Sequence, residues 1–78
     1  MRHDSALHIW TVYDHPRDMP DKFVARLWRI KRDGAFPTDS VIITETLEQV
    51  RTILLAEMGL TRLARDPNDD PIIAEIWL

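Results

Sequence analysis

The residues with the clearest chemical potential lie in YDHPRDMPD, residues 13–21. An aspartate next to a histidine can orient an imidazole for general-base catalysis, so Asp14 and His15 form a candidate catalytic pair. Adjacent residues at a strand end are expected to point in opposite directions, however, and the prolines and aspartates suit a tight turn for backbone reasons alone. The sequence therefore favours a rigid turn and no catalytic residue, with Tyr13, Asp14, His15 and Met19 as a candidate recognition loop.

Metal and cofactor chemistry has little support in the sequence. Asp66, Asn68, Asp69 and Asp70 resemble the oxygen ligands of a calcium loop, but they lack the twelve-residue spacing, the central glycine and the closing glutamate. The chain has no cysteine, its histidines lack helical i, i+4 spacing, and two glycines cannot build a phosphate-binding loop. We therefore expect no metal, no cofactor, and a turn over residues 66–71.

One basic segment, residues 22–32, carries a nucleic-acid signal. Basic side chains contact phosphates and aromatic rings stack on bases. In this segment a tryptophan stands among several basic residues: Arg26, Trp28, Arg29, Lys31 and Arg32. The formal net charge of −3 argues against nucleic acid as the partner. A nucleic-acid-binding module is therefore an alternative, ahead of a small enzyme that uses Asp14 and His15.

Length and composition indicate the broad class of the protein. With 78 residues, 45% of them hydrophobic, we expect a single domain over residues 1–78 that is stabilised by packing alone. The polar, acid-containing start does not resemble a signal peptide, and no apolar run is long enough to cross a bilayer. The expectation is a cytoplasmic protein that does not associate with membranes.

The elements that must position these residues can be predicted from local patterns. Residues 7–13, 23–31 and 41–44 are rich in β-branched and aromatic residues and predict strands. Thr46 and Gln49 match a capping box, apolar residues follow at helical spacing, and Gly59 suits a C-terminal cap, which predicts a helix over about 47–58. A short edge strand is expected over 60–64 and a closing strand over 72–78.

The predicted fold class is α+β. A mainly antiparallel sheet of three to five strands, in the order ββ(β)α(β)β, carries the single helix on one face. Asp33, Gly34 and Pro37 are taken to break the chain between the second and third strands.

Alternation along each strand then divides the sheet residues into two faces. One set is almost wholly apolar and suits the helix: Leu7, Ile9, Thr11, Tyr13, Phe23, Ala25, Leu27, Ile72, Ala74, Ile76 and Leu78. The second set contains all three tryptophans together with charged residues: His8, Trp10, Val12, Val24, Arg26, Trp28, Ile30, Ile73, Glu75 and Trp77. This division assumes that no strand contains a bulge, because a slip of one residue exchanges the faces.

One helix of twelve residues covers only one side of such a sheet, so the tryptophan-bearing face needs another cover. A homodimer that stacks these faces, or residues 32–40 folded across one of them, is the first expectation. The second is an unknown protein partner, for which the interaction surface would be Trp10, Arg26, Trp28, Glu75 and Trp77. Both describe a protein that acts by association.

Two segments, YDHPRDMPDKFVAR near the start and DDPIIAEIWL at the end, resemble a group of small bacterial proteins of unassigned function. The resemblance covers nearly the whole chain. It implies a self-contained bacterial protein, and it implies no activity, cofactor or catalytic residue.

Overall fold

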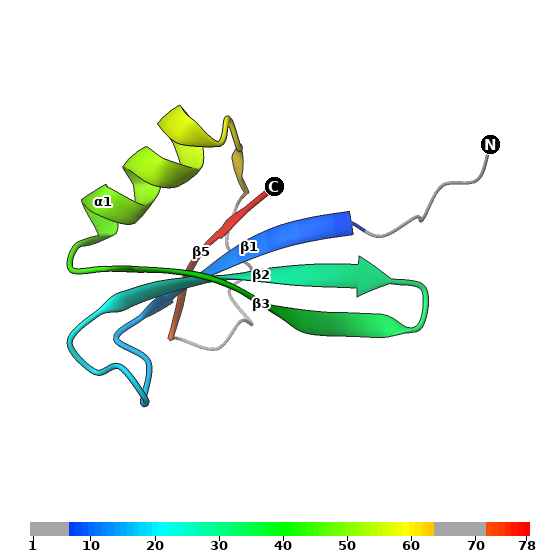
Figure 1. Ribbon diagram of the computed structural model, residues 1–78, viewed down its shortest axis with the longest axis horizontal. Helices are drawn as coiled ribbons and strands as arrows, with labels where there is room; N and C mark the ends of the chain where they lie inside the picture. The colour runs from blue at the N-terminus through cyan, green and yellow to red at the C-terminus, as the bar shows by residue number, and fades with distance from the viewer. Residues whose placement is uncertain (1–6, 64–71) are drawn as a thin grey trace.

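The computed structural model describes residues 7–63 and 72–78, which form one antiparallel five-stranded sheet and a single helical segment (Figure 1). The strands lie in the order β3-β2-β1-β5-β4. Their bounds are β1 Leu7–Asp14, β2 Phe23–Lys31, β3 Gly34–Thr44, β4 Arg62–Leu63 and β5 Ile73–Trp77. The helical segment consists of α1, Leu47–Thr52, and its continuation η1, Ile53–Glu57. The predicted α+β class is confirmed.

The third strand is the main correction to the predicted elements. β3 begins at Gly34, well before the predicted start at residue 41, because Arg32 and Asp33 form a two-residue turn and the chain pairs again at once with β2. Gly34 takes a φ of 143°, which residues with a side chain rarely adopt. Residues 34–40 therefore belong to the sheet and do not fold across one of its faces. Pro37 is tolerated because β3 is an edge strand whose pairing is interrupted by a bulge there.

The helix begins and ends where the sequence predicts. Thr46 accepts a hydrogen bond from the Gln49 backbone at 3.1 Å, and the Gln49 side chain accepts one from the Thr46 backbone at 3.2 Å, so the capping box is present. After Thr52 the helix widens, as the Met58 N–H donates to the Ile53 carbonyl at 3.1 Å. Gly59 follows with a φ of 67°, the left-handed conformation of a helix end.

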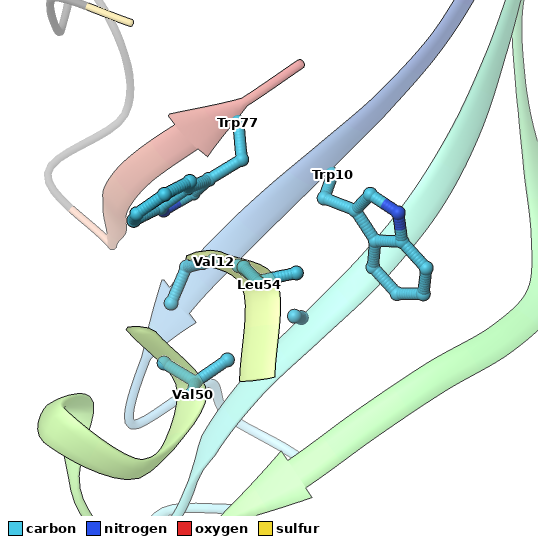
Figure 2. Packing of buried hydrophobic residues seen from close by; sticks show 6 residues of the cluster. Trp10, Val12, Val50, Leu54 and Trp77 are labelled. Carbon is cyan, nitrogen blue, oxygen red and sulfur yellow. The ribbon is translucent and has the colours of Figure 1, made fainter. Parts of the chain in front are cut away.

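The core lies between this helix and the middle of the sheet. Val50 and Leu54 of the helix are fully buried against Val12 of β1 and Ala25 of β2. Trp10 and Trp77 flank the cluster, as Figure 2 shows. Half-buried apolar side chains surround it: Phe23, Leu27, Ile42, Leu47, Leu60 and Ala74. The sheet and helix therefore form two layers with one apolar interface.

The turn between β1 and β2 is held by backbone hydrogen bonds and contains two prolines. The Met19 N–H donates to the Pro16 carbonyl at 2.9 Å, and the Lys22 N–H donates to the Met19 carbonyl at 3.2 Å, which makes two consecutive β-turns. Pro20 stands at the second position of the second turn, where its fixed φ is favourable. Pro16 is buried and Met19 is half-buried, so this apolar pair is partly withdrawn from water.

Two neighbouring leucines on the helix test where the core lies. Leu54 is fully buried, whereas Leu55 is 60% exposed. Leu54→Ala should lower the free energy of unfolding by about 2–5 kcal/mol, because it leaves a cavity beside Val12 and Val50. Leu55→Ala should change it by less than about 1 kcal/mol. Urea unfolding of the two variants gives the comparison, and equal losses would contradict this placement of the helix.

Candidate functional site

The three tryptophans do not share one face of the sheet, and this prediction was wrong. Directly opposed residues of an antiparallel pair point to the same side, and Trp10 is opposed to Leu27 on one neighbour and to Trp77 on the other. Trp10 and Trp77 therefore lie under the helix, 8% and 4% exposed. Trp28 is opposed to Ile9 and lies on the other side.

The physical reason is the register between strands. Alternation correctly places Trp10 with Trp77 and Val12 with Glu75, but a bulge between Val12 and Tyr13 moves Ile73 to the other face, opposite Tyr13. The long turn after β1 places even-numbered residues of β1 opposite odd-numbered residues of β2, which exchanges the faces of β1 and β5 relative to β2. The predicted interaction surface is thus divided: Trp10, Glu75 and Trp77 are buried on the helix side, and Arg26 and Trp28 are half-buried on the other.

The side of the sheet opposite the helix is apolar, and no described helix or strand lies across it (Figure 1). We call it the open sheet face. Its residues come from four strands: Leu7, Ile9, Thr11, Tyr13, Val24, Arg26, Trp28, Ile30, Ala35, Pro37, Val41, Ile43, Ile73 and Ile76. The turn over 15–22 contributes only at one end, where Pro16 and Asp18 line a small pocket with Val24 and Arg26. Val41 and Ile43 are 40% and 46% exposed.

The polar groups of the open sheet face are bonded within the chain. The Trp28 indole N–H donates to the Tyr13 hydroxyl at 3.1 Å. The Arg26 guanidinium donates to the Thr38 carbonyl at 2.7 Å, and the Thr38 hydroxyl donates to the Leu27 carbonyl at 2.9 Å. These bonds fix Trp28 and Arg26 in place. Among the strand residues that define this face, Arg26 is the one with a charged side chain, and Asp18 of the turn lies beside it at one end.

A buried carboxylate lies on the opposite side, under the end of the helix. Glu75 of β5 is 5% exposed, and its two oxygens have different partners. One oxygen, Oε2, accepts from Arg51 of α1, including the Nε–H at 2.7 Å, and from Arg62 of β4 at 3.1 Å. The other, Oε1, accepts the indole N–H of Trp77 at 3.0 Å. One side chain thus connects the helix, β4 and β5.

These contacts shift the ionisation of Glu75. Burial disfavours the charged carboxylate, but hydrogen bonds from Arg51, Trp77 and Arg62 outweigh that effect and hold the pKa of Glu75 below its ordinary value of 4.5. The hydrogen bond that Arg51 donates to Glu75 also raises the pKa of Arg51. Strand alternation alone predicts Glu75 on an interaction surface and does not identify its partners. The missed signal is its position two residues before a core tryptophan, where a carboxylate needs a cationic partner.

Asp14 and His15 do come into contact, contrary to the expectation that they point apart. His15 takes a positive φ of 53°, and its Nδ1 lies against the Asp14 carboxylate. The imidazole also packs on Phe23, with ring centroids 4.8 Å apart. Both side chains are 49% exposed, and the small pocket beside this turn is lined by other residues. The pair is an exposed turn contact.

The basic strand presents its cations on both faces of the sheet. Arg26 lies on the open sheet face, whereas Arg29 lies on the helix side beside His8 and Phe36. The preceding Lys22 pairs with Glu45 at 3.2 Å. A continuous track of phosphate contacts needs cations along one surface, and this strand does not provide it.

Two further predictions concern metal binding by the acidic turn and the crossing of a membrane. The acidic turn over 66–71 lies outside the described residues, and within 7–63 and 72–78 no cluster of histidine, aspartate and glutamate side chains could hold a metal ion. Over the same two ranges, no helix combines the length and hydropathy that a membrane span requires.

No protein-family model matches this chain, and neither a curated protein nor a solved structure is significantly similar to it.

The buried carboxylate predicts how stability depends on pH. Because the folded pKa of Glu75 is lower than the unfolded value, its contribution is complete above about pH 4.5 and is lost as the pH falls through the folded pKa. Glu75→Gln should lower the free energy of unfolding at pH 7 by about 1–3 kcal/mol and flatten its decline in acid. Urea unfolding between pH 7 and pH 3 measures both effects. Parallel pH profiles for the two proteins would contradict the assignment.

Proposed function

We propose that this protein acts by association and that its open sheet face stacks on the same face of a second copy. The observation that carries the proposal is a four-stranded, largely aliphatic surface with Trp28 near its centre and no described element across it. Monomeric proteins rarely expose contiguous apolar patches larger than about a few hundred Å². Two such sheets can pack face to face at a separation of about 10 Å.

The charge pattern favours a second copy over a different protein. A heterologous partner is usually selected by complementary charges. The strand residues of the open sheet face include one charged side chain, Arg26, whose guanidinium already donates to the Thr38 carbonyl of its own chain, and Asp18 stands only at its end. A surface without a charge pattern is well suited to a two-fold interface, in which each residue must accept the same patch on the partner.

The dimensions of the face set the strength of the dimer. Four strands about 4.8 Å apart and roughly 26 Å long give a planar area of about 500 Å². Two stacked copies would therefore remove about 1,000 Å² from water, near the lower bound for a specific interface. We expect a reversible dimer with a dissociation constant in the micromolar range, so that concentration controls the assembly.

A pair of matched lysine substitutions tests this proposal. Val41 lies on the open sheet face and is 40% exposed, whereas Met58 lies at the end of the helix and is 42% exposed. Val41→Lys should weaken dimerisation at least 10-fold, because it brings two cations into one desolvated interface. Met58→Lys should alter the dissociation constant by less than about 2-fold. Sedimentation equilibrium over a wide concentration range measures all three proteins.

Two results would contradict the proposal. The first is a monomer at every concentration up to about 1 mM, far above the expected dissociation constant. The second is a dimer that Met58→Lys weakens as much as Val41→Lys does, since that would place the interface on the helix side.

A further inference from the structure

A pocket opens on the helix side of the molecule, between the end of the helix and β4. Its volume is about 510 Å³, within the range of small-molecule sites. The residues around it come from α1, η1, the segment before β4, β4 itself and β5: Glu48, Arg51, Thr52, Leu55, Ala56, Leu60, Thr61, Arg62 and Trp77. It shares no residue with the open sheet face, so its role is independent of dimerisation.

One part of the pocket is apolar. Leu55, Ala56 and Leu60 line it beside Trp77, and Leu55 is 60% exposed although it follows the fully buried Leu54. The exposed Leu55 side chain keeps apolar surface in contact with water, which is unfavourable. An aliphatic or aromatic group placed against it would recover part of that free energy.

The other part of the pocket offers hydrogen-bond donors. Arg51 and Arg62 each carry five N–H donors, and among the described residues they direct three of these ten to Glu75. Their side chains are 38% and 53% exposed, so the other donors face the pocket or water. Guanidinium groups match the planar geometry of a carboxylate, which can accept two parallel hydrogen bonds.

The surrounding charges limit the ligand to a single negative charge. The negative charge of Glu75 already neutralises one of the two positive charges of Arg51 and Arg62. Glu48, one helical turn before Arg51, lines the same pocket and repels anions. A phosphate monoester would bring up to two negative charges to a region that has at most one to match, whereas a carboxylate brings one.

We propose that this pocket binds a small organic monocarboxylate with an apolar body. The carboxylate accepts hydrogen bonds from the free donors of Arg62 and Arg51, and the apolar body lies against Leu55, Leu60 and Trp77. Glu75 has a positioning role, since it holds both guanidinium groups at the edge of the pocket. The alternative is that the two arginines have only a structural role, in which their contacts with Glu75 hold the helix and β4 together.

Hexanoate is a suitable probe, because it combines one carboxylate with a five-carbon apolar tail. Titration at constant ionic strength and pH 7, followed in two-dimensional ¹H–¹⁵N NMR spectra, should shift the Trp77 indole and Arg51 Nε–H signals with saturation at a dissociation constant on the order of 1 mM. Hexanol, acetate and inorganic phosphate should bind at least 10-fold more weakly. Hexanol has no carboxylate, acetate has no apolar tail, and inorganic phosphate has neither.

Two variants distinguish ligand binding from a purely structural role of the arginines. Arg62→Gln should weaken hexanoate binding about 10-fold, whereas Glu48→Gln should tighten it about 3-fold by removing a repelling charge. Arg32→Gln, in the exposed turn before β3, is the matched control and should have no effect. Absence of a saturable shift with hexanoate, equal binding of hexanol, or unchanged affinity in both variants would overturn the proposal. If Arg62→Gln fails to fold, the Glu48→Gln comparison decides the question.

Discussion

One helix has to cover a sheet that is wider than the helix, and the rest of the molecule depends on this constraint. The side chains of Val12 and Ala25 meet those of Val50 and Leu54 over the middle strands, and the fully buried apolar residues of the described chain all lie at this interface. A chain of this size has little other core to contribute. The side of the sheet beneath the helix is therefore closed, while the opposite side keeps its aliphatic residues near water.

Glu75 shows how the same constraint shapes the electrostatics. A carboxylate under the helix is costly unless cations reach it, and here the cations come from two separate elements. Arg51 extends from the helix and Arg62 from a two-residue strand, so a single buried charge holds both elements against β5. This arrangement leaves the two arginines at the rim of a pocket, where their outward donors are accessible. The structural role of these arginines and the binding role proposed for them would thus use one set of contacts.

The sequence predicts the elements well and their mutual register poorly. Local signals such as the Thr46–Gln49 capping box and Gly59 act within a few residues, so the helix and the two long strands were predicted closely. β3 was predicted too short, because a two-residue turn and an edge position make Gly34 and Pro37 acceptable inside a strand. The division of faces failed between β1 and β2, since alternation within each strand contains no information on which parity faces which. The partners of Glu75 were missed for the same reason, as they depend on contacts between distant segments.

The edge of the sheet adds a consequence for solubility. β3 is eleven residues long and borders no other described strand on its outer side, which is the usual template for uncontrolled strand addition and fibril growth. Pro37 removes one backbone donor from this edge, and the interruption in pairing between Arg26 and Trp28 bends the strand away from a regular ladder. These two features discourage another chain from extending the sheet sideways. A dimer of the proposed kind would thus use the sheet face and not the strand edge.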